Sequence, residues 1–213
     1  INEIINPFSL KLDYDSDIAA ISRSSEGGST TERHILYALA LKMIEKYGKG
    51  ETLVNFLTEK LYLNISTKTV SLLLQNDNQH YAYDLLGALK SDMVSAFYID
   101  ADEECPDVEE YVGFSRQIGA ISAYAYLGDV GDSITGDKKA QKFEDDYIDL
   151  LFDVLEDLGF DAVTYMPSRN TMAQLLKVKS LCEKHGFLQI SGEDINSPRQ
   201  KFICEVLRNP EFK

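Results

Sequence analysis

The sequence predicts a mixed α/β protein, in which an all-helical lobe at residues 29–100 precedes alternating helices and strands at residues 101–213. Two observations predict this class. Apolar residues recur at helical spacing in the first region, and short apolar runs alternate with amphipathic stretches in the second. Residues 1–28 are polar and irregular, and they end at Gly27 and Gly28, which favours a connector.

The helical lobe is predicted from its first helix onward. Ser29 and Glu32 have the spacing of a capping box, and Gly48 and Gly50 mark the end of the helix. Between them runs an apolar stripe of Ile35, Leu36, Leu39, Met43 and Ile44. Further helical segments are expected at residues 51–61, 67–74 and 80–95.

The second region is expected to alternate regularly. Helices are predicted at residues 107–117, 143–158, 171–185 and 199–208, and strands at 120–126, 161–166 and from Leu188 to the stop at Gly192. Such βα repeats imply parallel strands joined by right-handed crossovers. Three strands make a small sheet, so we expect either short strands in the N-terminal region or completion by sequence outside this chain.

Charge and composition exclude several classes of partner. The formal net charge is -14 and the pI about 4.6, so neither nucleic acid nor an anionic membrane is an expected partner. No apolar run approaches the roughly 20 residues that span a bilayer. Three cysteines without a CxxC pair favour a reducing cytoplasm. Because the chain begins with Ile1 rather than Met, we expect its N-terminus to be a cut end.

Polar residues follow each predicted strand, and parallel strands open on one common face. They are Tyr126, Asp129, Asp132, Ser133, Thr135, Asp137, Lys138 and Lys139 after the first strand, Arg169 and Asn170 after the second, and Glu193, Asp194, Asn196 and Arg199 after the third. Carboxylates and amides beside Lys and Arg suit a divalent metal with a phosphate group. The alternative is a solvated loop rim of the same composition.

Several stretches resemble the polymerase and histidinol phosphatase (PHP) family. The run Pro-Asp-Val-Glu-Glu-Tyr-Val-Gly-Phe-Ser-Arg-Gln-Ile-Gly-Ala-Ile-Ser-Ala-Tyr-Ala-Tyr-Leu at residues 106–127 resembles the helix and strand that end in that family's Ala-His-Pro. Gly-Phe-Asp-Ala-Val at 159–163 and Ser-Gly-Glu-Asp-Ile-Asn at 191–196 are similar to its next strand and its closing Gly-Ser-Asp-Phe-His. Thr-Glu-Arg-His at 31–34 is similar to its Arg-Pro-His element.

This resemblance covers about half the chain and implies a fold and a site. The implied fold is the C-terminal part of a distorted (β/α)7-type barrel with an inserted helical lobe, and the implied activity is metal-dependent hydrolysis of phosphate esters. Asp194 matches a metal-ligating aspartate, while Tyr126 and Asn196 stand where the family has histidines. The implied cofactor is a divalent metal, Mn, Zn, Fe or Mg. Glu193 beside Asp194 is the candidate catalytic helper.

Four residues are candidates for binding phosphate. Arg169 and Arg199 lie near prolines in predicted strand-to-helix loops, and a guanidinium can grip two phosphate oxygens. The alternative for each is an ion pair with a nearby acid. Arg33 and His34 lie in the first turn of the capped helix, where free N–H groups favour an anion. The alternative for His34 is an ordinary surface histidine.

The sequence therefore predicts a metal-dependent phosphoesterase of which this chain is a partial and inactive portion, because the family's opening His-x-His has no counterpart in it. The competing hypothesis is a non-catalytic PHP-like protein that binds a phosphorylated or acidic small ligand. A third class, a helical interaction module, rests on helix content alone. No P-loop, GxGxxG, HExxH or Ser-His-Asp arrangement is present.

Overall fold

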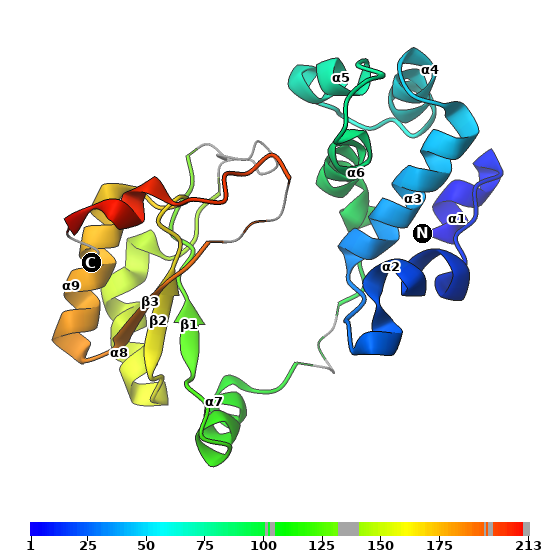
Figure 1. The fold of residues 1–213 in the computed structure, drawn as a ribbon. Coiled ribbons are helices and arrows are strands. Elements are labelled where there is room, and N and C mark those ends of the chain that lie inside the picture. The colour runs from blue at the N-terminus through cyan, green and yellow to red at the C-terminus, as the bar shows by residue number, and fades with distance from the viewer. Residues whose placement is uncertain (101, 103–104, 132–140, 194, 196–197, 211–213) are drawn as a thin grey trace. The chain divides into compact units, whose positions relative to one another are not determined.

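The computed structural model describes residues 1–213 except 101, 103–104, 132–140, 194, 196–197 and 211–213 (Figure 1). The chain divides into two compact units. The first consists of Ile1–Ile99 with Ser197–Arg199, and the second of Asp100–Asn196 with Gln200–Lys213. Among the described residues, no helix combines the length and the apolar character that crossing a membrane requires.

Residues 1–28 differ from the predicted connector, because they are helical and contribute to the core of the first unit. Their short elements are α1 (Asn2–Ile5), a 3-10 turn (Asn6–Phe8), a π-helical turn (Tyr14–Ala19), α2 (Ala20–Ser22) and a second 3-10 turn (Ser24–Glu26). Ile5, Leu10 and Leu12 are buried, and Asn2 exchanges two hydrogen bonds of 2.9 Å with the backbone of Leu12. Elements this short show no helical period in the sequence.

The rest of the first unit contains the four helical segments that apolar spacing predicts. They are α3 (Glu32–Tyr47), α4 (Glu51–Asn55) continuing into a π-helical turn (Phe56–Lys60), α5 (Thr67–Leu73) and α6 (Tyr81–Phe97). The predicted cap of α3 is wrong by two residues. Thr31 is the N-cap, and its N–H donates to Nδ1 of His34 at 3.1 Å.

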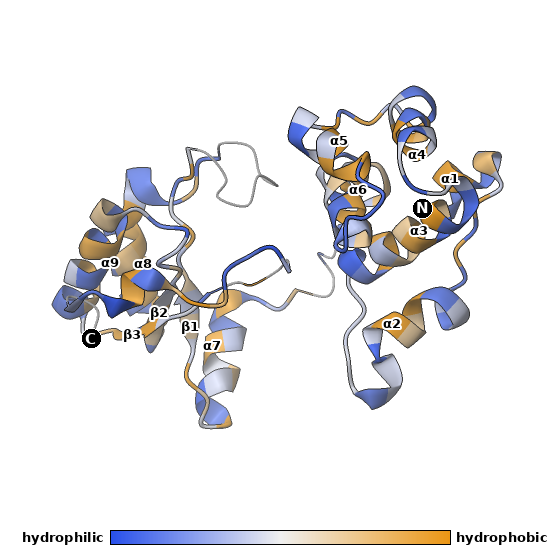
Figure 2. Ribbon diagram, turned by 45° about the horizontal axis from the view of Figure 1, so that its top comes forward, coloured by the Kyte–Doolittle hydropathy of each residue, from blue (hydrophilic) through white to orange (hydrophobic). Residues whose placement is uncertain are grey.

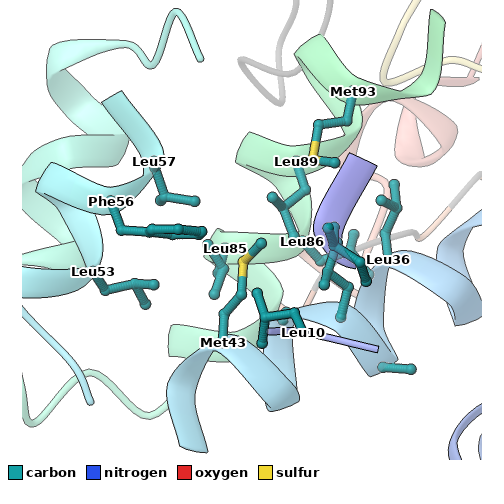
Figure 3. Packing of buried hydrophobic residues seen from close by; sticks show 14 of the residues in the cluster. Leu10, Leu36, Met43, Leu53, Phe56, Leu57, Leu85, Leu86, Leu89 and Met93 are labelled. Atoms are coloured by element: carbon teal, nitrogen blue, oxygen red, sulfur yellow. The ribbon is translucent and has the colours of Figure 1, made fainter. Parts of the chain in front are cut away.

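Leucine and methionine side chains of α3, α4 and α6 fill the core of this unit (Figure 3). Leu36, Leu39 and Met43 of the predicted stripe are fully buried, and Ile35 and Ile44 pack against them. Because each helix turns its apolar side inward, the cluster receives side chains from several directions.

The second unit confirms the predicted alternation of helix and strand. Its elements are α7 (Val108–Gln117), β1 (Ala123–Ala125), a 3-10 turn (Asp145–Tyr147) leading into α8 (Ile148–Leu158), β2 (Ala162–Tyr165), α9 (Met172–His185) and β3 (Leu188–Ser191). The strands form one parallel sheet in the order β1-β2-β3. Each strand therefore pairs with its neighbour in sequence, and the carboxyl ends of all three lie at one edge.

The two faces of this sheet are unequal. Val163 and Tyr165 of β2 pack against α8 and α9, with Phe152 and Val178 between the layers. On the other face Ala162 pairs in register with Leu188, which is 55% exposed. Figure 2 colours each residue of these elements by its hydropathy. The helices thus cover one face, and apolar side chains of β3 stay open to solvent on the other.

The last predicted helix, residues 199–208, is wrong. The described residues there form only a 3-10 turn at Glu205–Arg208, and Arg199 belongs to the first unit. Phe202 and Ile203 are adjacent and exposed, so no apolar stripe at helical spacing is available to bury. The described strands number three, so the seven-stranded barrel that the resemblance implies stays a prediction.

Candidate functional site

The loops that follow β1 and β2 meet at the carboxyl edge of the sheet. The carbonyl oxygen of Leu127, after β1, accepts hydrogen bonds from Nε of Arg169 at 3.0 Å and from Nδ2 of Asn170 at 2.7 Å. Asn170 is buried, and its Oδ1 accepts from the N–H of Met166 at 3.2 Å. We call this region, residues 126–129 with 166–170, the strand-end site.

Gly128 is the position at which this arrangement requires glycine. Its φ is +68°, in the left-handed region that side chains other than glycine rarely adopt. A Cβ atom there would lie 2.7 Å from Nδ2 of Asn170, 2.8 Å from the hydroxyl of Tyr126 and 2.9 Å from Nε2 of Gln174. Three polar side chains therefore approach the backbone where only a hydrogen atom fits.

A buried carboxylate, that of Glu144, holds the chain after β1 in place. Glu144 is only 4% exposed. It accepts from the N–H of Leu127 at 3.2 Å, from the N–H of Gly128 at 2.9 Å and from the hydroxyl of Tyr124 at 3.0 Å. A buried carboxylate needs such donors because burial without them costs several kcal/mol.

The neighbouring carboxylate of Asp145 ties β1 to α9. It accepts from the hydroxyl of Tyr126 at 2.5 Å, from Nε2 of Gln174 at 2.7 Å and from the N–H of Asp129 at 3.2 Å. Asp129 in turn pairs with Nζ of Lys142 at 2.7 Å, which lowers the pKa of the Asp129 carboxyl. The polar side chains around this edge are thus largely engaged with one another.

Tyr126, which the resemblance places at a metal-ligand position, is engaged with a neighbouring carboxylate, and its role as a ligand stays a prediction. Its side chain is 1% exposed, and its hydroxyl donates to Asp145. Burial, followed by the hydrogen bond to Asp145, raises the pKa of Tyr126 well above its ordinary value. In this structure the Tyr126 hydroxyl is thus a hydrogen-bond donor within the polar edge.

The other two metal-ligand candidates, Asp194 and Asn196, lie outside the described residues. Within the part of the chain that the structure describes, no group of three or more His, Cys, Asp or Glu side chains could hold a metal ion. The assignment of Asp194 and Asn196 stays a prediction.

Arg169 lies in the strand-end site, as the sequence predicts, and its guanidinium is held on two sides. Nε donates to Leu127, and the guanidinium carbon lies 5.3 Å from the centre of the Phe143 ring. Its Nη2 atom is buried and finds no hydrogen-bond partner among the described residues. The ion pairs formed within the same residues do not include Arg169 either. The described residues therefore provide neither a carboxylate for its charge nor an acceptor for Nη2.

Glu193, the candidate catalytic helper, contacts the loop after β2. Its Oε1 accepts from the N–H of Ser168 at 3.1 Å, and its Oε2 accepts from the Ser168 hydroxyl. Burial, followed by the nearby Glu193 carboxylate, raises the pKa of the Cys204 thiol. In this arrangement Glu193 links β3 to the loop after β2.

The remaining phosphate-binding candidates belong to the first unit, so their grouping with Arg169 stays a prediction. His34 is engaged in the cap of α3, where Nδ1 also lies 3.0 Å from Oγ1 of Thr31. Arg33 is half-buried in the first turn of the same helix. For Arg199, the sequence analysis gave an ion pair as the alternative to phosphate binding. The structure shows such a pair, between Nη2 of Arg199 and Oδ2 of Asp84 at 2.8 Å.

Sequence reasoning missed the two carboxylates that organise the site, Glu144 and Asp145, and the amide of Gln174. One signal was present. Glu144, Asp145 and Asp146 form an acidic run directly before α8, and acids are favoured at helix N-termini. This acidic run predicts the start of a helix. It does not predict that Glu144 and Asp145 contact the residues that follow β1.

The fold and the site together define a parallel α/β unit with a polar, arginine-containing site at the carboxyl edge of its sheet. No family model, no curated protein and no solved structure matches the chain.

Proposed function

We propose that the second unit binds a phosphorylated or acidic small ligand at the strand-end site, with Arg169 as its main cationic contact. The observation that carries the proposal is the buried Nη2 of Arg169, which has no partner among the described residues. A buried donor without a partner costs about 1–3 kcal/mol, and more when it is charged. An oxygen atom of a bound anion would remove this cost.

The guanidinium is already positioned for such a ligand. Its Nε is fixed on the Leu127 carbonyl and its plane is near the Phe143 ring, so little side-chain freedom is left to lose on binding. Phosphate and carboxylate oxygens are the acceptors that match a guanidinium in geometry and charge. These contacts favour an anion over a neutral ligand.

The charge of the unit limits the expected affinity. Its residues include 23 acidic against 11 basic side chains, so its field repels an approaching anion at long range. Recognition therefore depends on short-range contacts with Arg169. We expect a dissociation constant on the order of millimolar for a simple phosphate, equivalent to about 4 kcal/mol.

The sheet supports a finer proposal for the fold, that the second unit contains two βα units and a third strand of a PHP-like barrel. Consecutive strands are direct neighbours, and α8 and α9 pack on the same face. A barrel wall has this order, whereas a doubly wound sheet reverses its order at a switch point. The exposed Leu188 and Ile190 would then face the barrel interior.

Hydrolysis of a phosphate ester is the second candidate function. The strand order favours it together with the resemblance of residues 106–127 and 191–196 to the PHP family. In this proposal Asp194 is the central catalytic and metal-binding residue, with Glu193 and Asn196 beside it. Its chemistry depends on residues outside the described part of the chain.

Titration of inorganic phosphate and phenyl phosphate into the ¹⁵N-labelled chain tests the first proposal. We expect saturable amide shifts at Leu127 and at Ser168–Thr171. Arg169→Gln should weaken binding at least about tenfold, the equivalent of about 1.4 kcal/mol. The matched control is Arg208→Gln, because Arg208 is an exposed arginine of the same unit that pairs only weakly with Glu205 at 3.2 Å.

Equal affinity of the Arg169→Gln variant and the unchanged chain would contradict the binding proposal. The hydrolysis proposal has a separate measurement, release of phosphate from phenyl phosphate with added Mn²⁺, Zn²⁺ or Mg²⁺. Phosphate release that Asp194→Ala abolishes would support it. Binding without metal-dependent release would leave ligand binding as the function of this unit.

A further inference from the structure

An arginine side chain lies bound at the start of α6 in the first unit. Nε of Arg199 donates to Oδ1 of Asp84 at 2.8 Å, and Nη2 donates to Oδ2 of the same carboxylate at 2.8 Å. Nη2 also donates to Oδ1 of Asn78 at 3.0 Å. The carboxylate is therefore gripped in the bidentate manner that distinguishes arginine from lysine.

The acceptors are held in place by the helical unit itself. Asn78 is 9% exposed, and its Nδ2 donates to the carbonyl of Leu72 at 3.1 Å and to Oδ2 of Asp84 at 2.7 Å. Its Oδ1 accepts from the N–H of His80 at 2.9 Å. These bonds fix the amide with its oxygen toward the guanidinium and need no contribution from Arg199.

The carboxylate is suited to a permanent cation. Burial by itself raises the pKa of Asp84, but the hydrogen bonds from Arg199 and Asn78 outweigh it and hold that pKa below its ordinary value. The Asp84 side chain is 10% exposed, so water competes for few of its lone pairs. An ionised and nearly buried carboxylate without its guanidinium would be costly.

From these contacts we infer that Asp84 and Asn78 form a binding site for an arginine side chain, which Arg199 fills and which an arginine of a partner peptide can fill in its place. The inference is independent of the function proposed for the strand-end site. Arg199 is 115 residues from Asp84 in sequence, so it acts as a tethered ligand. A tethered ligand competes at an effective concentration on the order of millimolar.

Removal of the tethered arginine should open the site. The probe is the peptide acetyl-Ser-Pro-Arg-Gln-amide, which copies residues 197–200, titrated into the ¹⁵N-labelled full chain. We expect it to bind the Arg199→Ala variant about tenfold more tightly than the unchanged chain, with shifts at the amide of His80 and at Nδ2 of Asn78. The lysine version of the peptide should bind at least about fivefold more weakly, because it cannot form two parallel bonds.

Two further variants keep the test specific. Adding Asp84→Asn to the Arg199→Ala variant should abolish peptide binding. Arg23→Ala, which removes an exposed arginine of the same unit that pairs with Glu26, should behave like the unchanged chain. Should Arg199→Ala not fold, Arg199→Lys serves instead, since a lysine occupant is more easily displaced.

Three results would overturn the inference. They are no saturable shift in a folded Arg199 variant, equal binding of the lysine and arginine peptides, and unchanged binding after Asp84→Asn. None of them bears on phosphate binding by Arg169, so the two proposals fail separately.

Discussion

The two units bury their apolar residues in different ways. Among the described residues of the first, twenty buried residues from α1 to α6 and the turns between them form one cluster, reached by side chains from several helices. Among those of the second, eleven buried residues lie between one face of the sheet and the helices α8 and α9. The first unit thus closes its core with its own helices, whereas the second leaves β3 exposed along its whole length.

Buried polar residues are more numerous in the second unit. Among the described residues it buries Ser115, Ser122, Glu144 and Asn170, of which the last two hold the loop after β1, whereas the first unit buries Ser22 and Asn78. Such networks stabilise little but fix one geometry, because each misplaced donor or acceptor is costly. The comparison indicates that the first unit has the larger apolar core, whereas the second combines a smaller core with a polar edge of defined geometry.

Substitution of a core leucine by alanine should have the largest effect on the free energy of unfolding and should distinguish the two units. Leu89 of α6 is fully buried, so Leu89→Ala should lower the free energy of unfolding by about 2–5 kcal/mol through lost burial and a cavity. Leu188→Ala on the open face of β3 should cost less than about 1 kcal/mol. Chemical denaturation measures both. Equal costs would show that the open face of β3 is covered in solution.

Substitution of Gly128 should cost somewhat less, and it isolates the polar edge. Gly128→Ala should destabilise the second unit by about 2–3 kcal/mol, from the positive φ and from displacement of Asn170 and Gln174. The matched control is Gly186→Ala, because Gly186 has a similar φ of +76° but no heavy atom within 4 Å of the place that a Cβ would take. That control should cost about 1 kcal/mol. Similar costs at both positions would mean that the close approach at Gly128 is unimportant.

The fold was predictable wherever a local pattern decided it. The helices α3 to α9 and the three strands follow apolar spacing, and glycine marks the ends of α3, α8 and α9. The cap of α3 was misplaced because Ser29–Glu32 and Thr31–His34 share the same spacing, and the pattern favours Glu at the last position. Residues 1–28 were misjudged because their elements are shorter than one period.

The site was only partly predictable, since it depends on contacts distant in sequence. Arg169 could be identified because polar residues after a parallel strand share one edge. The side chains that hold the site together are distant in sequence from the groups they contact. Glu144 accepts a hydrogen bond from Gly128, 16 residues away, and Asp145 accepts one from Gln174, 29 residues away. No pattern of neighbouring residues predicts contacts across such separations in sequence. Tyr126 was placed at the correct edge, but its burial and its bond to Asp145 are tertiary facts.

The smallest expected effect concerns the tyrosines of β1 and its end. Burial and Asp145 raise the pKa of Tyr126 above its ordinary value near 10, and burial and Glu144 do the same for Tyr124. A raised pKa in the folded state means that the neutral phenol stabilises the fold below pH 10 and that this stability is lost as the pH rises above 10. Burial also raises the pKa of Tyr37, Tyr47 and Tyr81 in the first unit, but the shifts of Tyr124 and Tyr126 are larger. The second unit should therefore lose more stability than the first at alkaline pH.

Tyr126→Phe tests this difference directly. At neutral pH it should cost about 1–2 kcal/mol, because Asp145 loses a donor while the apolar ring is kept. Above pH 10 the cost should shrink, because phenylalanine cannot ionise and the unchanged chain is itself losing stability there. Chemical denaturation followed across this pH range, with Tyr147→Phe at an exposed position as control, gives both numbers. If the cost of Tyr126→Phe stays constant with pH, the Tyr126 hydroxyl is not the group that makes the polar edge sensitive to alkali, and Tyr124 becomes the residue to replace.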